Sequence, residues 1–113
     1  MTVESTTNQV TELLETSKAL DISKLCVKNL TPMFDYIFVC TATSDRHAKS
    51  IATNIIRHFK PQFASTPRVE GLETCEWILV DLNDTIVHIM SKKTREFYKI
   101  EQLWQISSLP KES

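Results

Sequence analysis

The residue types that most often carry enzymatic chemistry are present in this sequence, but they are scattered. Three aspartates, Asp35, Asp81 and Asp84, lie in or beside predicted strands, where carboxylates could hold Mg²⁺ for nucleotidyl transfer. That reaction also needs a loop that grips phosphate, and the chain contains a single glycine, Gly71, so no glycine-rich loop is present. A magnesium-dependent nucleotidyltransferase therefore remains an alternative hypothesis that lacks its phosphate-binding motif.

The histidines suggest little further chemistry. His47 belongs to the run Ser44-Asp45-Arg46-His47 at the start of a predicted helix, where an exposed N-terminus could bind an anion. Capping of the helix by Ser44 explains the same run without a ligand. His58 and His88 have no second histidine or cysteine at the spacing of metal ligands, so we predict no metal and no cofactor.

The cysteines are also unlike a reactive or cross-linked set. Cys26, Cys40 and Cys75 are odd in number, far apart, and placed in or next to apolar segments. This arrangement predicts buried reduced thiols, and indicates neither a disulfide framework nor a zinc site nor a cysteine nucleophile.

Length and composition predict one small globular domain over residues 1–113. The chain has 42% hydrophobic and 24% charged residues, which is typical of a folded protein outside the membrane. No apolar run approaches the roughly 18 residues of a membrane span. The first residues resemble neither a secretory signal nor a transit peptide, so we expect a cytoplasmic protein without a membrane partner.

The charges are segregated along the chain although the net charge is only -1. The segment 69–91 has no lysine or arginine and contains five acids: Glu70, Glu73, Glu76, Asp81 and Asp84. The segment 42–68 has the opposite charge balance. Asp45 is its only acid, and its lysines and arginines are Arg46, Lys49, Arg57, Lys60 and Arg68. The acidic stretch favours a basic partner and disfavours bare nucleic acid, so we expect no direct contact with DNA.

Hydrophobic periodicity predicts helices alternating with strands. Helices are expected over residues 4–19, after Ser44 to about residue 60, and over 92–104 behind a Ser91 cap; strands are expected over 22–27, 36–41, 67–70, 77–82 and 85–90. This order predicts an α/β (α+β) fold with a mixed sheet of about five strands covered by helices.

The last two strands are separated only by Asn83-Asp84, which predicts a tight hairpin with a defined register. One face of the hairpin is then apolar and belongs to the core. The other face pairs Trp77 with Met90, Leu79 with His88 and Asp81 with Ile86.

Two interpretations of that second face remain open. In the first, a helix covers the face, Trp77 is a core residue, and Asp81 forms a buried pair with His88. In the second, the face is partly open and forms a binding patch, because interface centres contain aromatic and methionine anchors ringed by charge. The acidic segment beside it favours the patch.

Four motifs in order resemble the ribosomal silencing factor (Iojap) family. They span nearly the whole chain and read Asp35-Tyr-Ile-Phe-Val-Cys-Thr-Ala-Thr-Ser-Asp-Arg-His47, Val69-Glu-Gly71, Trp77-Ile-Leu-Val-Asp-Leu-Asn-Asp-Thr-Ile-Val-His-Ile89 and Arg95-Glu-Phe-Tyr-Lys-Ile-Glu-Gln-Leu-Trp104. The resemblance implies a fold similar in outline to nucleotidyltransferases but without enzymatic activity.

The resemblance also implies a function. Members of the family bind the large ribosomal subunit through its fourteenth protein, block association with the small subunit by bulk, and so repress translation. The implied partner-binding residues, with those of the hairpin patch, are Trp77, Asp81, Leu82, Asn83, Asp84, His88 and Met90. A third hypothesis, a homodimer or larger homo-oligomeric scaffold, would use Trp77 and Met90 for self-association.

This chain departs from the family pattern at two positions where glycine is usual, Ala42 and Asn83. Asparagine tolerates the left-handed conformation, so we expect the hairpin turn to survive. At Ala42 a positive φ would be strained by about 1 kcal/mol, which would affect the loop from Thr41 to His47.

Overall fold

The computed structural model describes residues 3–102, which form a five-stranded mixed sheet with helices on both faces. The strands are β1 (Leu20–Cys26), β2 (Tyr36–Ala42), β3 (Arg68–Glu70), β4 (Trp77–Asp81) and β5 (Thr85–Ser91), and their spatial order is β1-β2-β5-β4-β3. Only the central pair β2 and β5 is parallel; the other neighbours are antiparallel. The mixed α/β fold expected from the sequence is confirmed.

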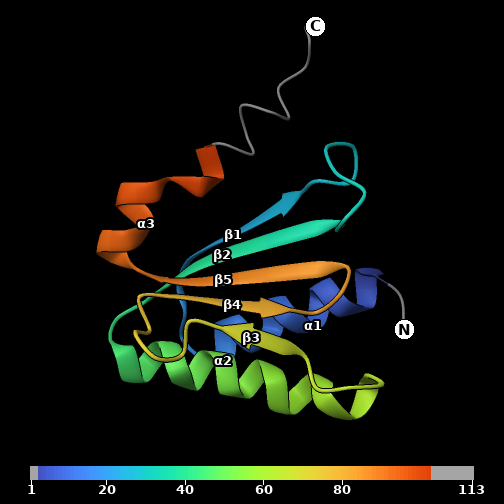
Figure 1. Ribbon diagram of the computed structural model, residues 1–113, viewed down its shortest axis with the longest axis horizontal. Coiled ribbons are helices and arrows are strands. Elements are labelled where there is room, and N and C mark those ends of the chain that lie inside the picture. Colours follow the sequence, from blue (N-terminus) through green and yellow to red (C-terminus); the bar gives the residue numbers. More distant parts are fainter. Residues whose placement is uncertain (1–2, 103–113) are drawn as a thin grey trace, which may run out of the picture.

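The helices divide the sheet into two unlike faces (Figure 1). Both long helices, α1 (Val3–Thr16) and α2 (Asp45–Phe59), pack on one face, which we call the helix-covered face. A short 3-10 turn, η1 (Lys60–Gln62), continues from α2. The shorter helix α3 (Lys92–Tyr98) lies at one end of the opposite face, which we call the groove face.

The main core lies between the sheet and the two long helices. Its fully buried members include Leu14 of α1, Ile55 and Phe59 of α2, and Phe38 and Ile78 of the sheet. A smaller cluster on the groove face is built from Val27, Ile37, Val39, Ile86 and Met90. Because β2 is buried on both faces, it is the continuous apolar run that the sequence shows.

The register of the hairpin is the predicted one. Trp77 pairs with Met90, Ile78 with Ile89, and Val80 with Val87. The turn uses one left-handed residue, Asn83 at φ 71°, which confirms that asparagine can replace glycine there. Ala42 does not adopt positive φ, so the strain considered at that position does not arise.

Three local predictions were wrong. The first helix ends at Thr16 rather than residue 19, because Lys18 turns the chain with φ 64°. The closing helix ends at Tyr98, because Lys99 adopts a left-handed conformation with φ 51° and ψ 44°; Leu103 and Trp104, which the prediction also included, lie outside the described residues. Cys26 is exposed, since it points away from the core at the end of an edge strand, whereas Cys40 and Cys75 are buried as expected.

Within residues 3–102, no helix has both the length and the apolar character needed to cross a bilayer.

Candidate functional site

The groove face contains a hollow of about 380 Å³ that α3 leaves uncovered. Strands β2, β4 and β5 form its floor, and the loop before β2 forms one of its walls. Its lining is mostly apolar, with charged residues among it: Met33, Phe34, Ile37, Arg68, Leu79, Asp81, Ile86, His88 and Ile100. We call this hollow the groove.

Trp77 lies on the same face and is held in a defined position. Its indole Nε1–H donates a hydrogen bond of 2.9 Å to Nδ1 of His88. The ring of Tyr98 from α3 packs against the indole with the ring centroids 4.9 Å apart. Trp77 is therefore half-buried under α3, with its polar edge satisfied inside the protein.

His88 is the polar partner that Trp77 needs. Burial lowers the pKa of His88 to about 4 from 6.5, because the protein surroundings disfavour the charged imidazolium. A neutral imidazole that accepts at Nδ1 carries its proton on Nε2. His88 is thus a structural acceptor at neutral pH.

Gly71 allows the chain to pass close to Trp77. Its φ is 90°, and a Cβ placed there would lie 2.1 Å from the carbonyl oxygen of Trp77. Any side chain would therefore push the start of β4 away from this loop. The only glycine of the chain is required for the position of Trp77.

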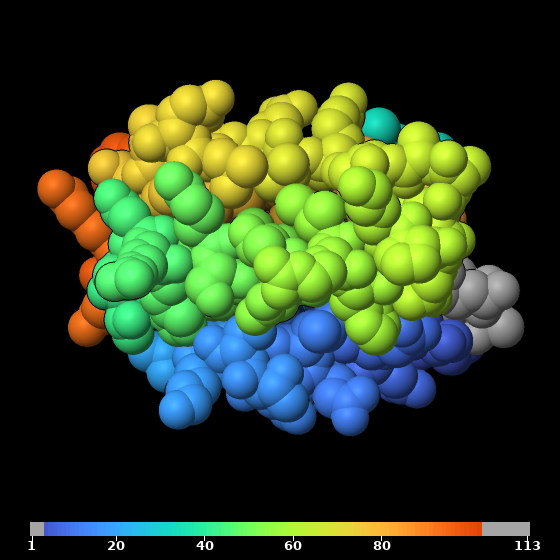
Figure 2. Space-filling view, turned by 90° about the horizontal axis from the view of Figure 1, so that it is seen from below, coloured from blue at the N-terminus to red at the C-terminus, as the bar shows by residue number. Residues whose placement is uncertain are grey.

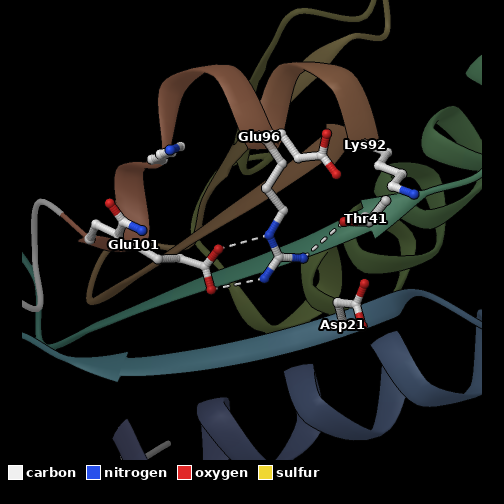
Figure 3. A pocket seen from close by; sticks show the side chains of 8 residues that line it. Asp21, Thr41, Lys92, Glu96 and Glu101 are labelled. Atoms are coloured by element: carbon white, nitrogen blue, oxygen red, sulfur yellow. Dashed lines mark hydrogen bonds and ion pairs between the residues drawn. The ribbon is translucent and has the colours of Figure 1, made fainter.

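The short helix α3 is fixed to the sheet by a polar clamp around Arg95 (Figure 3). The guanidinium donates to both carboxylate oxygens of Glu101, at 2.8 Å each, and to the hydroxyl of Thr41 on β2 at 2.9 Å. Ser23 on β1 joins the network through hydrogen bonds with Arg95 and Glu101. The hydrogen bonds from Arg95 are the main cause that holds the pKa of Glu101 below its usual value. The clamp thereby holds α3 over the Trp77 end of the face.

Acidic side chains are spread along the β3 and β4 side of the sheet, from the hairpin tip to the loop that leads into Trp77. Asp81 is partly neutralised, because one oxygen lies 3.4 Å from the Arg68 guanidinium and the other accepts from the backbone N–H of Asn83 at 2.9 Å. Asp84 is exposed at the turn, and Glu70, Glu73 and Glu76 are exposed on and between β3 and β4. We call these five residues the acidic rim; within residues 3–102, Arg68 is the one cation paired with any of them.

The structure divides the seven predicted site residues into three groups, and the side chains of two of these groups are at least partly exposed. Trp77, Asp81 and His88 lie on the groove face, and Asn83 and Asp84 are exposed at the hairpin tip.

Leu82 and Met90 do not fit the prediction that they are contact residues. Leu82 is 2% exposed because strand alternation turns it into the helix-covered core. Met90 is 0% exposed because it is packed into the smaller cluster beneath Trp77 and Ile100. Both side chains are therefore out of reach of a partner in this conformation.

Each of the two interpretations of the hairpin face describes part of it. The end bearing Trp77 is covered by a helix, whereas the end bearing Leu79 and Asp81 opens into the groove. Asp81 and His88 do not pair with each other, since each is bonded to another residue.

The sequence did not predict the groove wall that is formed by the loop between β1 and β2. Met33 is 71% exposed and Phe34 is half-buried, both in the loop between β1 and β2. Two large apolar residues directly after Thr31-Pro32 were the available signal. Ile100 could not be placed without knowing that the chain turns at Lys99.

The other candidate chemical groups have structural partners. His47 Nδ1 accepts from the backbone N–H of Thr43 at 3.0 Å, and Ser44 caps α2 by accepting from the N–H of His47. Burial raises the pKa of the Cys40 thiol to about 12. Among the described residues, no three His, Cys, Asp or Glu side chains are grouped so that they could hold a metal ion.

Comparisons with known proteins agree with this architecture. The family model described as "Ribosomal silencing factor during starvation" matches residues 1–113. The ribosomal silencing factor of Haemophilus influenzae is 39% identical over 93 residues, covering 82% of this chain and 91% of that protein.

More distant relatives and a solved structure extend the likeness. A mouse protein named "Mitochondrial assembly of ribosomal large subunit protein 1" is 28% identical over 104 residues, which cover 89% of this chain and 46% of that longer protein. A crystal structure from Chromobacterium violaceum superposes with a TM-score of 0.87 at 34% identity, covering 93% of this chain and 88% of the other. Because the family model matches all 113 residues of the chain and a relative is 39% identical to it, the chain belongs to the ribosomal silencing factor family.

Proposed function

We propose that this chain binds the large ribosomal subunit through its groove face, contacts the fourteenth protein of that subunit, and blocks association with the small subunit. Family membership supports a role on the ribosome. The name of the mouse relative, which refers to assembly of the large ribosomal subunit, supports that subunit as the partner.

The observation that carries the proposal is the partly open apolar groove beside the acidic rim. Protein interfaces have a desolvated centre with apolar anchors and a polar border. Leu79, Met33 and Phe34 supply apolar surface at the groove, and Trp77 supplies a rigid aromatic edge beside it. The acidic rim would complement a basic protein surface and speed its encounter, with an effect that weakens at high salt.

The proposed mechanism requires no chemical reaction. The protein measures 42 × 34 × 22 Å, so even its thinnest dimension would separate two surfaces that must touch for the subunits to join. The arrangement of the groove fits a binding role, because His88 and Asp81 are both occupied in internal hydrogen bonds.

Gradient sedimentation with separated ribosomal subunits tests the proposal. We expect wild-type protein to sediment with the large subunit and to reduce the amount of joined ribosome. Trp77→Ala should weaken large-subunit binding by about 2 kcal/mol or more, as truncation of an interface anchor does.

Two further variants keep the test independent of folding. Met33→Glu places a charge at the exposed wall of the groove without touching the core, and should also weaken binding. Phe97→Ala removes an aromatic ring that is 76% exposed outside the groove lining and serves as the matched control. Folded Trp77→Ala and Met33→Glu proteins that bind like Phe97→Ala would contradict the proposal.

A further inference from the structure

The outward side of α2 carries a pair of cations near each of its ends. Arg46, Lys49, Arg57 and Lys60 are all exposed, and Lys60 directly follows the helix as its C-cap. At 100° and 1.5 Å per residue, these four positions fall within about 80° of the helix circumference and extend over roughly 21 Å. Figure 2 shows α2 crossing this side of the molecule beside α1. We call the four residues the basic stripe.

Helix stability explains only part of the basic stripe, because the helix dipole favours the two cations at the C-terminal end, Arg57 and Lys60. None of its residues forms an ion pair with another described residue. Arg46 lies in the first turn, where the helix dipole disfavours a cation. Arg46 with Lys49, and Arg57 with Lys60, are like-charged neighbours three residues apart, which weakens a helix slightly.

The same surface lacks what a protein partner would need. The exposed large hydrophobic residues of the described chain are Leu20, Met33, Phe97 and Tyr98, and none of them belongs to α2. Protein interfaces are depleted in lysine and depend on apolar anchors at their centre. A lysine- and arginine-rich surface without anchors fits a partner that is recognised by its charge.

Between the cations the stripe offers hydrogen-bond donors. Ser50 and Thr53 are exposed on the same side of α2, and hydroxyl groups commonly accompany Lys and Arg in contacts to phosphate. Arginine adds a planar fork that matches two phosphate oxygens. No Phe, Tyr or Trp side chain of α2 is exposed to stack on an unpaired base, and the ring of the exposed His58 packs edge-on against Phe59.

We propose that the basic stripe binds the phosphodiester backbone of double-helical RNA. Double-stranded RNA is recognised mainly through its shape, phosphates and 2′-hydroxyls, which a rigid row of Lys, Arg, Ser and Thr side chains can contact without reading bases. The stripe is on the opposite side of the sheet from the groove, so this contact goes beyond the proposed protein contact and does not depend on it.

The neighbouring helix limits where the RNA can lie. Glu4, Glu12 and Glu15 are exposed on α1 and would repel a polyanion that crossed both helices. On the other side of α2 lies the segment between β3 and β4, with the exposed Glu73 and Glu76. The RNA backbone should therefore follow the axis of α2 towards η1, between these two acidic flanks.

The inference can be tested with a plain RNA duplex of about 20 base pairs. Fluorescence anisotropy measures its binding to the protein in 50 to 200 mM salt. We expect wild-type protein to bind, with affinity falling as salt rises at a logarithmic slope of about −2 to −4, as for a few phosphate contacts. Arg57→Glu with Lys60→Glu should weaken binding at least tenfold at low salt, and Arg57→Gln with Lys60→Gln should weaken it less.

The control is Lys92→Glu with Lys93→Glu, which reverses two exposed lysines on α3 and changes the net charge equally. It should alter RNA binding less than threefold. Equal losses in the two charge-reversed variants, no binding by wild-type protein, or a salt slope near zero would each overturn the inference.

These measurements test the two proposed contacts independently of each other. Met33→Glu should weaken binding to the large subunit while leaving binding to the RNA duplex unchanged. A loss of duplex binding by Met33→Glu equal to that of the stripe variant would assign RNA binding to the groove and contradict the inference.

Discussion

The two faces of the sheet are built in different ways. On the helix-covered face, side chains such as Phe59, Ile55 and Leu14 are fully buried between α1, α2 and the strands. On the groove face, a helix of seven residues covers one end only, and it is held by the polar Arg95 clamp. The comparison indicates that one face supplies most of the stability, which leaves the other free to keep apolar surface open for a partner.

Truncating a phenylalanine on each face should give the largest contrast. Phe59→Ala should lower the free energy of unfolding by about 3–5 kcal/mol, because it leaves a cavity in the closed core. Phe34→Ala should lower it by about 1 kcal/mol or less, because Phe34 is half-buried beside the groove and water can fill the space. Urea denaturation of both variants measures the difference.

Binding completes this first comparison. Phe34→Ala should weaken association with the large subunit although it hardly changes stability. Similar losses of stability in the two variants would show that the faces contribute equally and would remove the distinction between them.

Acid should act on the groove face through His88. Its pKa is about 4 in the folded protein and about 6.5 when unfolded, so the unfolded state binds the proton first as pH falls. The free energy of unfolding therefore has its full value above about pH 6.5. It falls by at most about 3 kcal/mol as the pH is lowered from 6.5 to 4.

The titration can be followed by NMR of the His88 ring and by denaturation across this pH range. His88→Gln should flatten the pH dependence of stability between pH 6.5 and 4, because glutamine does not titrate. A His88 resonance titrating near pH 6.5 in the folded protein would contradict the buried acceptor role.

Breaking the Arg95 clamp should have a smaller effect, localised on α3. Glu101→Ala should lower the free energy of unfolding by about 2 kcal/mol, because it leaves the Arg95 guanidinium, with a side chain 12% exposed, without its carboxylate. Amide hydrogen exchange should accelerate in α3 while that of α2 stays slow.

Glu96→Ala is the matched control for the clamp, since it removes an exposed carboxylate from the same helix. Protonation of Glu101 by acid should have the same effect as Glu101→Ala. It should occur only below the usual pKa of a glutamate, because the pKa of Glu101 is lowered. Unchanged exchange in α3 of the Glu101→Ala protein would show that the clamp does not hold the helix.

The smallest expected change in stability is at the acidic rim. Arg68 is largely exposed, and its ion pairs with Asp81 and Glu70 are 3.4 and 3.8 Å long, so Arg68→Ala should change stability by less than about 0.5 kcal/mol. The variant should nevertheless associate faster with a basic partner at low salt, because Asp81 is no longer neutralised. Stopped-flow association at two salt concentrations measures this rate. Lys18→Ala, which removes an exposed cation from the turn after α1, is the control. An equal rate change in both variants would attribute the effect to net charge alone.

Local patterns were sufficient to predict the strands and the register of the β4–β5 hairpin. The alternation in residues 77–82 and 85–90 with a two-residue turn defined which side chains share a face, and Ser44 and Ser91 both cap helices where expected. Patterns of this kind are encoded within a few residues, so they survive in any tertiary context.

The composition of the groove was not predictable in the same way. Met33, Phe34 and Ile100 come from segments far apart in the chain, and they meet beside Leu79 only because the left-handed turn at Lys99 and the strand order bring them together. Leu82 was assigned to the site through the family resemblance, although the predicted hairpin register already placed it on the core face. Met90 shares a face with Trp77, and only packing distinguishes a buried apolar residue there from an exposed one.

Periodicity, turn residues and charge segregation thus sufficed for the elements, the hairpin faces and the division into acidic and basic segments. Tertiary structure alone decided that α3 covers Trp77 but not Leu79, that His88 is a neutral acceptor, and that Asp81 pairs with Arg68. The physical reason is that strand and helix patterns depend on neighbours in sequence, whereas burial, pKa and exposure depend on neighbours in space.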